Sequence, residues 1–290
     1  MEAEFALFNL LSGINNFWRG EYEKLGAQNL LAKLLNYEYS ATKKMEEIDQ
    51  RVKSWAPEKT WNEMKTLGIN FICDKDKNWP ISLELATPAP FGLQYLGENS
   101  CFTNLTNSIS IVGTRNPTSY GERIASDFAA GFADRGWQVV SGGALGIDAA
   151  AHRGCLIAEG ETIAVMAGGL KNLYPNSNLK LFERIIQSGL IISELPFDTP
   201  ALPSRFLVRN RIIAAISNGV LVVEAAGRSG SLRTALDANK YHKPVFTIPG
   251  PITSPASEGC HRLVIERMGE LVTSVGEIIE LIKPTQPILI

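Results

Sequence analysis

The sequence predicts an α/β domain with a doubly wound, mostly parallel sheet, preceded by a small helical domain. Two observations support this prediction. From Ser108 onward, short β-rich apolar runs alternate with amphipathic stretches, and glycines join them. Before that point, apolar residues recur at the spacing of three and four residues that is typical of helices. The two patterns therefore indicate two architectures in one chain.

The helical pattern extends from Glu2 to about Leu67. Its apolar positions are Phe5, Phe8, Leu11, Leu30, Leu31, Leu34, Leu35, Met45, Ile48 and Val52. A short strand is expected at Ile69–Cys73, and a proline-rich connection follows it. We place the domain boundary near residues 104–107. The expected organisation is a helical domain with its connector at 1–105, a core at 106–283 and a tail at 284–290.

The core is expected to hold six strands and six helices in alternation. The strands are predicted at 108–113, 137–142, 162–168, 190–194, 219–225 and 244–250. The helices are predicted near 120–135, 146–159, 177–188, 206–217, 230–240 and 258–267. Strands that are apolar almost throughout belong to a parallel sheet with both faces covered. Such a sheet binds its ligands outside the carboxyl ends of its strands.

The composition is that of an ordinary globular protein, with 45% hydrophobic and 20% charged residues. The net charge of −2 does not by itself indicate nucleic-acid binding. Between Pro200 and Arg233, however, the only acid is Glu224, and the chain carries Arg205, Arg209, Arg211, Arg228 and Arg233. A local basic patch on a neutral body is one interpretation, and arginines that are solvated or paired locally are the other.

Other sequence features concern the compartment and the chemistry. The four cysteines form no Cys-x-x-Cys pair, so we expect buried thiols, no disulfide framework and no metal site. The N-terminus lacks a basic segment, and no apolar run reaches about 18 residues, so neither a signal peptide nor a membrane span is expected. A cytoplasmic protein is the resulting prediction.

Polar clusters follow the first two predicted strands of the core. Gly113 and Arg115 lie at a strand-to-helix turn, where backbone N–H groups would attract a phosphate. The next turn is rich in glycine but matches neither a P-loop nor a dinucleotide-binding fingerprint. Asp148 and His152 follow it, four residues apart on one helical face, where they could hydrogen-bond as in a hydrolase. Because no nucleophile elbow accompanies them, a capping role for Asp148 is favoured.

Three more clusters follow later strands. Lys171 and Tyr174 suit a phosphate contact combined with base stacking. The run Arg209-Asn210-Arg211 is expected to open a helix, where the dipole disfavours positive side chains, so an anion or a nearby acid is indicated. The turn from Gly227 to Ser231 follows Glu224 and could cradle an oxyanion.

These clusters, in this order, resemble the DNA-processing protein A family, also called DprA or Smf, over about residues 70–283. The matching strings are IVGTRNPTSYG, SGGALGIDAAAH, GGLKNLYPNSN, RNRIIAAIS, VVEAAGRSGSLRTA and IPGPITSPASEGCHRL. The resemblance implies an extended Rossmann-like core that binds single-stranded DNA, forms a homodimer and helps to load the recombinase RecA during natural transformation. It implies no catalytic turnover and no cofactor.

The resemblance also implies the DNA-binding residues. They are Gly113, Thr114, Arg115, Ser119, Tyr120, Ser141, Gly142, Gly143, Ala144, Gly169, Lys171, Tyr174, Asn178, Arg209, Asn210, Arg211, Ser229, Gly230 and Ser231. Many relatives place a lysine where this chain has Asn176, so Lys171 or Lys180 is expected to supply that charge. Many relatives also end in a winged-helix domain, which the expected tail is too short to form.

An enzyme is the alternative. Rossmann-like proteins with a glycine-rich loop and a nearby glutamate cleave nucleoside monophosphates at the N-glycosidic bond, and in that interpretation Glu224 and Arg209 would be catalytic. A third possibility is an interaction scaffold that recruits a recombinase and contacts DNA only incidentally.

Overall fold

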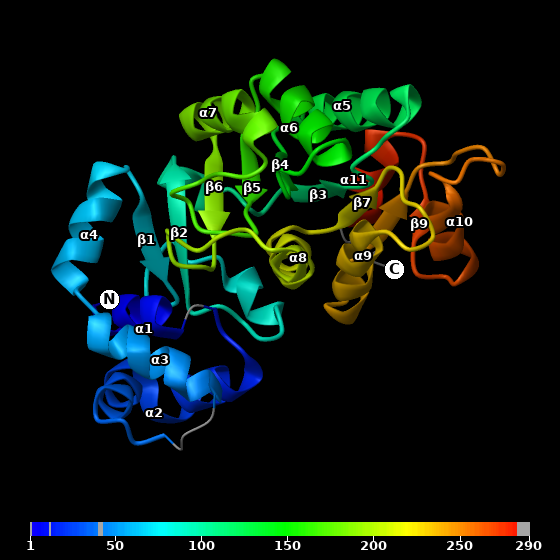
Figure 1. The fold of residues 1–290 in the computed structure, drawn as a ribbon. Coiled ribbons are helices and arrows are strands. Elements are labelled where there is room, and N and C mark those ends of the chain that lie inside the picture. Colours follow the sequence, from blue (N-terminus) through cyan, green and yellow to red (C-terminus); the bar gives the residue numbers. More distant parts are fainter. Residues whose placement is uncertain (1, 12, 40–42, 283–290) are drawn as a thin grey trace, which may run out of the picture.

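A mixed nine-stranded sheet runs through the computed structural model, which describes residues 2–11, 13–39 and 43–282 (Figure 1). The strand order is β1-β2-β6-β5-β4-β3-β7-β8-β9. All pairings are parallel except β1 with β2 and β2 with β6. The strands are β1 (Asn70–Cys73), β2 (Gly92–Gly97), β3 (Ser108–Val112), β4 (Gln138–Ser141), β5 (Thr162–Val165), β6 (Leu190–Ser193), β7 (Val220–Val222), β8 (Val245–Thr247) and β9 (Glu270–Leu271).

The predicted fold class is confirmed. Strands β3 to β8 are buried at every position, as expected for strands covered on both faces. Each of the six begins within one residue of its predicted start, and each ends one to three residues before its predicted end. The residues beyond those ends have left the hydrogen-bonded ladder and form the turns of the carboxyl edge.

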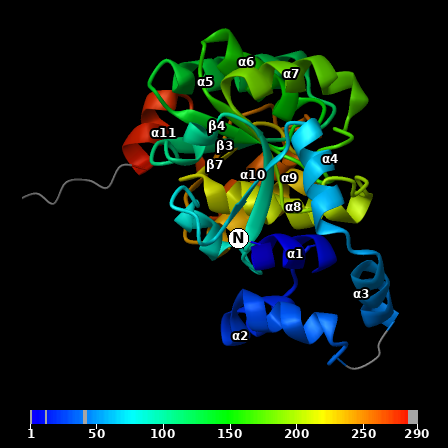
Figure 2. The ribbon, with the colours of Figure 1, turned by 90° about the vertical axis from the view of Figure 1, so that its left-hand side faces the viewer.

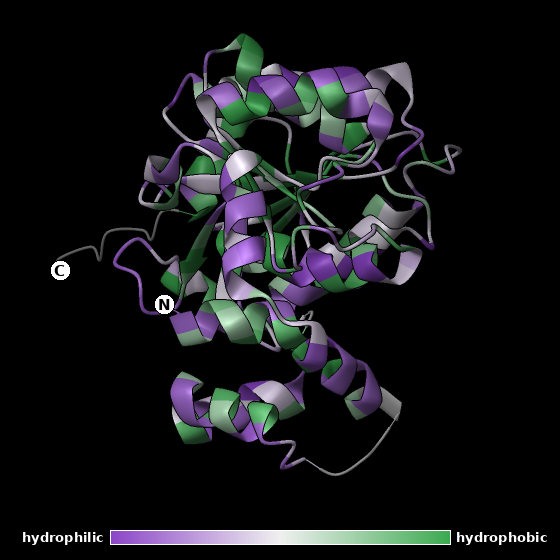
Figure 3. Cartoon of the chain, turned by 60° about the vertical axis from the view of Figure 1, so that its left-hand side comes forward, coloured by the Kyte–Doolittle hydropathy of each residue, from purple (hydrophilic) through white to green (hydrophobic). Residues whose placement is uncertain are grey.

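Two layers of helices cover the sheet. Helices α5 (Ser119–Ala133), α6 (Ile147–Ile157), α7 (Leu179–Ser188) and α11 (Val275–Ile282) pack on one face. Helices α8 (Pro203–Ile216), α9 (Gly230–Lys240) and α10 (Glu258–Ile265) pack on the other face. Figure 1 shows α5 to α7 above the sheet and α8 and α9 below it. In Figure 3 the hydrophobic strands lie between helices whose outer surfaces are largely hydrophilic.

The N-terminal part is helical, as predicted from its periodicity. It contains α1 (Glu2–Leu11), α2 (Asn16–Leu35), α3 (Lys43–Ser54) and α4 (Pro57–Thr66). Figure 2 shows α1, α2 and α3 together at the end of the molecule opposite α5 to α7. Short 3₁₀ helices occur at Ile81–Leu85, Asn99–Phe102 and Asn176–Asn178.

The connector between these parts belongs to the sheet. Strands β1 and β2 precede the expected boundary near residue 105, yet β2 pairs directly with β6. The rings of Phe5 and Phe8 on α1 lie 5.4 and 5.2 Å from that of Phe71 on β1, measured between centroids. The helical part therefore packs on the sheet through β1. The tail expected at 284–290 lies outside the described residues.

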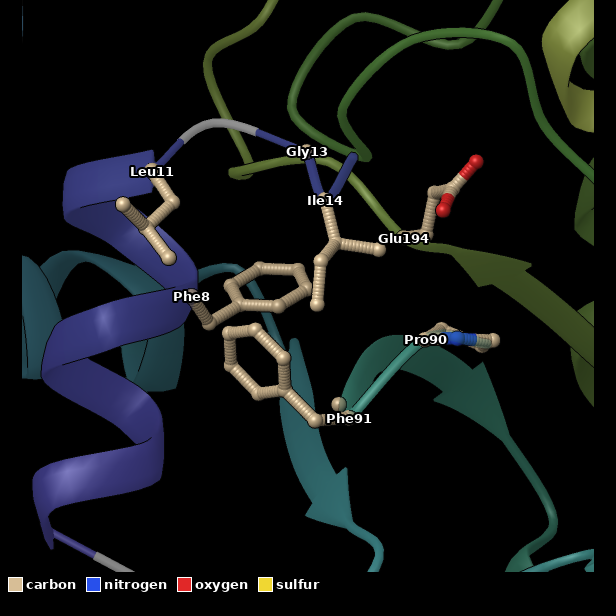
Figure 4. A pocket seen from close by; sticks show the side chains of 8 residues that line it. Phe8, Leu11, Gly13, Ile14, Pro90, Phe91 and Glu194 are labelled. Atoms are coloured by element: carbon tan, nitrogen blue, oxygen red, sulfur yellow. The ribbon is translucent and has the colours of Figure 1, made fainter. Parts of the chain in front are cut away.

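A small pocket marks the junction of α1 with the sheet (Figure 4). The rings of Phe8 and Phe91 fill its lower part, and the carboxylate of Glu194 points away from them. Elsewhere, all four cysteines are buried and unpaired, as expected. No helix in the described part of the chain combines the length and apolar character that crossing a bilayer requires.

Candidate nucleic-acid interface

The chain direction across the sheet reverses at β3. The sequence runs from β3 through β4 and β5 to β6 on one side, and returns to β7 and β8 on the other. Ligands of open α/β sheets bind at such a switch point. A cavity of about 580 Å³ lies there, within the size range of small-ligand sites. The predicted site residues that line it are Gly113, Arg115, Ala144, Tyr174, Arg209, Asn210, Ser229, Gly230 and Ser231.

The turn after β3 carries Arg115 into the cavity. Its guanidinium lies over the ring of Phe206 on α8, 4.6 Å from the ring centroid. Thr114 holds the turn through its backbone, because its N–H donates to the Glu224 carbonyl at 2.7 Å and its carbonyl accepts from Ile147 N–H. A Cβ on Gly113 would lie 2.6 Å from the Ile147 side chain, so this close approach requires glycine.

The turn after β4 arranges Asp148 and Arg209. The Gly142 carbonyl accepts a hydrogen bond of 2.7 Å from Arg209 Nη1. The N–H groups of Gly142 and Ala144 donate to Asp148 Oδ2 at 3.2 and 3.4 Å. Asp148 therefore bonds the turn in front of α6, whereas Gly146 is the N-cap of that helix.

Electrostatics in this corner are set by burial. Burial raises the pKa of Asp148, against the opposing effects of Arg209, the two backbone donors and Arg115. The pKa of Arg209 is lowered to about 10, mainly by burial, an effect that Asp148 opposes and Arg115 reinforces. At neutral pH Arg209 is consequently still protonated. Its Nε is buried and has no hydrogen-bond partner in the described chain.

Helix α8 begins earlier than the sequence predicts. Pro203 occupies its first turn, so the run Arg209-Asn210-Arg211 lies in the helix interior and meets no penalty from the dipole at the N-terminus. Arg209 points into the cavity, and Asn210 donates to the Gly230 carbonyl at 3.0 Å. Arg211 instead pairs with Glu194, at 2.8 and 2.5 Å. The nearby acid that the sequence allowed for is thus present, and Arg211 does not line the cavity.

The turn after β5 contributes Tyr174, which is half exposed and packs edge-on against Phe206, with 6.0 Å between ring centroids. Lys171 lies elsewhere, in a groove beside α4, with its Nζ 5.5 Å from the Phe197 ring centroid. Gly169 is packed against the backbone of Pro196 and Phe197. Lys171 therefore does not line the cavity.

Other predicted site residues do not line the cavity, and some of them hydrogen-bond the turns that form its walls. Asn178 donates to the carbonyls of Gly143 and Ala144, and Gly143 has a positive φ of 64°. Ser141 is buried and donates to the Ile111 carbonyl. Tyr120 donates to the Pro249 carbonyl at 3.0 Å, and Ser119 lines a separate groove along α5 and α6. Tyr120 and Ser119 thus do not line the cavity.

The turn before α9 offers small polar groups. Ser229 is the N-cap of α9, and its Oγ accepts from Ser231 N–H at 3.3 Å. The two hydroxyls are 2.7 Å apart. A helix N-terminus that opens onto a cavity favours an anionic ligand.

The hydrolase constellation is not assembled. Asp148 and His152 do not bond each other, because His152 Nδ1 pairs with Thr162 at 2.7 Å. Glu224 accepts from both the backbone N–H and the hydroxyl of Thr118, and it does not line the cavity. No cluster of potential metal ligands occurs among the residues that the structure describes.

Sequence reasoning missed eight lining residues of the cavity, and three of them, Asp148, Phe206 and Thr234, carry polar or aromatic groups that a ligand could contact. Phe206 appeared only as an apolar residue of a helix, although it lies three positions before Arg209 and thus on the same helical side. Asp148 was expected to cap its own helix. Thr234 lies four positions after Gly230 on α9, a spacing that could have indicated its face.

Comparison with known sequences shows a family for most of the chain. Residues 70–283 match the family described as "DNA recombination-mediator protein A". The chain is 41% identical over 226 residues to a protein from Mycobacterium tuberculosis named "Putative DNA processing protein DprA", which covers 74% of this chain. It spans 58% of that relative's length. Over 213 residues it is 36% identical to the Bacillus subtilis "DNA processing protein DprA", covering 73% of this chain and 71% of the relative.

Solved structures of proteins with the same name share this fold. DNA processing protein A from Streptococcus pneumoniae superposes with a TM-score of 0.82 at 30% identity, covering 96% of this chain and 97% of its own. DNA processing protein A from Helicobacter pylori superposes with a TM-score of 0.66 at 29% identity, covering 73% and 95%. The Helicobacter pylori structure was described for its unique single-stranded DNA binding mode.

Proposed function

This chain belongs to the DNA recombination-mediator protein A family, and from that membership we propose that it binds single-stranded DNA in the cavity between β3 and β7. The observation that carries the proposal is the grouping of Arg115, Phe206 and Tyr174 on one wall. A cation beside aromatic rings is the combination that grips single strands without reading much sequence. The single-stranded DNA binding mode described for the Helicobacter pylori relative supports it.

The protein would bind the strand without catalysing a reaction on it. Arg115 and the backbone N–H groups at the start of α9 would hold phosphates, since both offer donors to an anion. Tyr174 and Phe206 would stack on a base. The remaining predicted residues, including Ser141, Gly142, Gly143 and Asn178, would shape the walls that present these groups. The engagement of Glu224 by Thr118 weighs against the alternative of a nucleotide N-glycosidase.

In the cell the protein would protect incoming single strands and help to load RecA during natural transformation and recombination, in the cytoplasm. The family membership supports this role.

A homodimer would bring two cavities together for cooperative binding. The edge formed by β9 and α10 supports this proposal, because Ile265 at the end of α10 and Leu271 on β9 expose 80% and 51% of their surface. Exposed apolar groups of this size are typical of interaction surfaces. Sedimentation of wild-type protein and of an Ile265→Arg variant tests the proposal, which requires a dimer that the substitution dissociates.

The DNA proposal is tested by comparing the mobility shifts of single-stranded DNA, double-stranded DNA and RNA oligonucleotides of equal length. Arg115→Glu should weaken single-strand affinity and lower the slope of log affinity against log salt by about 0.7 for each lost phosphate contact. The control is Arg184→Glu, which makes the same charge change on the exposed side of α7, outside the cavity lining. An unchanged slope in the Arg115 variant, or no binding by wild-type protein, contradicts the proposal.

A further inference from the structure

Asp148 presents an unused acceptor to the cavity. Its side chain lines the cavity although only 7% of the residue is exposed. Both backbone donors bond Oδ2, and no described residue donates to Oδ1. Oδ1 is not among the buried atoms that lack a partner, so it is accessible from the cavity and accepts hydrogen bonds from whatever occupies it. The turn after β4 therefore holds a fixed acceptor that faces the place where a ligand binds.

The charge of this acceptor gives the two ends of the cavity different preferences for ligand groups. A carboxylate repels phosphate, so phosphates should lie toward the start of α9, where Ser229, Gly230 and Ser231 offer a positive helix end. The corner at Asp148 instead suits a neutral group that carries N–H donors. In a DNA strand those donors belong to the nucleobases.

The bases differ in what they could offer to this corner. Guanine carries two adjacent N–H donors, at N1 and N2, beside the acceptor O6. Thymine offers one N–H between two carbonyl oxygens, which a carboxylate would repel. Arg115 and Arg209 are the basic groups near Asp148, and a guanidinium beside a carboxylate complements the donor and acceptor edge of guanine.

We propose that Asp148 gives the DNA-binding cavity a preference for guanine, an inference that rests on the proposed function. The oxygen Oδ1 accepts from the guanine edge, an arginine donates to O6, and the purine stacks on the wall formed by Phe206 and Tyr174. Asp148 is then a specificity-determining residue of a site whose other contacts, to phosphates and by stacking, read little sequence.

The test uses fluorescence anisotropy with four oligonucleotides of equal length. One contains thymine only, and the others carry guanine, inosine or adenine at the same spaced positions. Inosine lacks the 2-amino group of guanine, and adenine controls for purine stacking. Wild-type protein should bind the guanine oligonucleotide about tenfold more tightly than the thymine one, with inosine intermediate and adenine close to thymine.

The variant Asp148→Asn should bind all four oligonucleotides with similar affinity, because an amide no longer supplies a charged acceptor. Asp127→Asn makes the same change on the exposed side of α5 and should keep the wild-type preference. Thermal denaturation checks that both variants fold, and if Asp148→Asn unfolds, the wild-type comparison of guanine with inosine still decides. Equal wild-type affinities for guanine, adenine and thymine, or a preference retained in Asp148→Asn, overturn the inference and leave DNA binding intact. Failure to bind any oligonucleotide overturns the proposed function itself.

Discussion

The carboxylate of Glu224 accepts two hydrogen bonds from Thr118, one of 2.9 Å from the backbone N–H and one of 2.6 Å from the hydroxyl. Glu224 follows β7, and Thr118 is the N-cap of α5. These bonds tie the end of the turn that carries Arg115 to the neighbouring strand. Glu224 is thus a positioning residue, and Gly121 leaves it space, because a Cβ there would lie 2.3 Å from the carboxylate.

Replacing Glu224 should loosen this turn. Glu224→Ala removes two partly buried hydrogen bonds between Thr118 and a carboxylate, so we expect a loss of about 1–3 kcal/mol in the free energy of unfolding and weaker DNA binding. Denaturant unfolding measures the first effect and anisotropy the second. Glu183→Ala, at an exposed position of α7, should change stability by less than about 0.5 kcal/mol. Equal stability of the two variants would falsify the role of Glu224 in holding the turn through Thr118. Release of free base from a nucleoside monophosphate by wild-type protein would instead support the hydrolase alternative.

Gly142 should be sensitive to a single methyl group. A Cβ there would lie 2.4 and 2.5 Å from the two Nη atoms of Arg209 and 2.6 Å from Asp148 Oδ2. Gly142→Ala must displace both charged groups, and the loss of one charge-assisted contact to DNA corresponds to about a tenfold loss of affinity. Gly20→Ala on α2 is the matched control, because its Cβ meets nothing within 4 Å. Wild-type affinity in Gly142→Ala would show that the arrangement is not needed for binding.

The sequence was sufficient to predict the sheet core and the edge of the sheet at which the cavity lies, because both depend on local signals. Continuous apolar runs mark fully buried strands, and glycines with polar residues mark their carboxyl ends. The roles of Arg209 and Arg211 were harder to separate, although two residues apart on a helix differ by about 200° in direction. Only tertiary packing reveals that one side faces the cavity and the other faces Glu194. The pairing of β2 with β6 joins distant segments, so local patterns could not predict it.

The pair formed by Arg211 and Glu194 should be costly to break on one side. Their side chains are 6% and 7% exposed, and each single substitution, Arg211→Met or Glu194→Leu, leaves a buried polar group without its partner. We expect each to lose about 3–5 kcal/mol in the free energy of unfolding, and the double variant Arg211→Met with Glu194→Leu to lose less than the sum of the singles. A double-mutant cycle by denaturant unfolding measures this coupling. Strict additivity would mean that the pair contributes no interaction energy.

The hydrogen bonds of His152 fix its tautomer. The Thr162 hydroxyl donates its one hydrogen to the Val139 carbonyl at 2.7 Å, so it must accept from His152 Nδ1–H at 2.7 Å. The other nitrogen, Nε2, is buried and has no partner in the described chain. If Nε2 were protonated, its N–H would therefore have no acceptor. The pKa of His152 is accordingly lowered to about 3, mainly by burial and in smaller part by Arg209 and Arg153.

This pKa predicts acid sensitivity in a defined window. Below pH about 6.5 the unfolded chain binds a proton at His152 that the folded chain excludes until pH about 3. Stability from this group is therefore complete above pH 6.5 and falls as the pH drops toward 3, by at most about 1.4 kcal/mol per pH unit. His152→Asn keeps a donor toward Thr162 but cannot titrate, so its unfolding free energy should depend less steeply on pH. His242→Asn, at an exposed position whose φ of 56° suits asparagine, should keep the wild-type dependence. Denaturant unfolding at several values between about pH 4 and 7 makes the comparison, and parallel curves for wild type and His152→Asn would rule out a neutral buried imidazole.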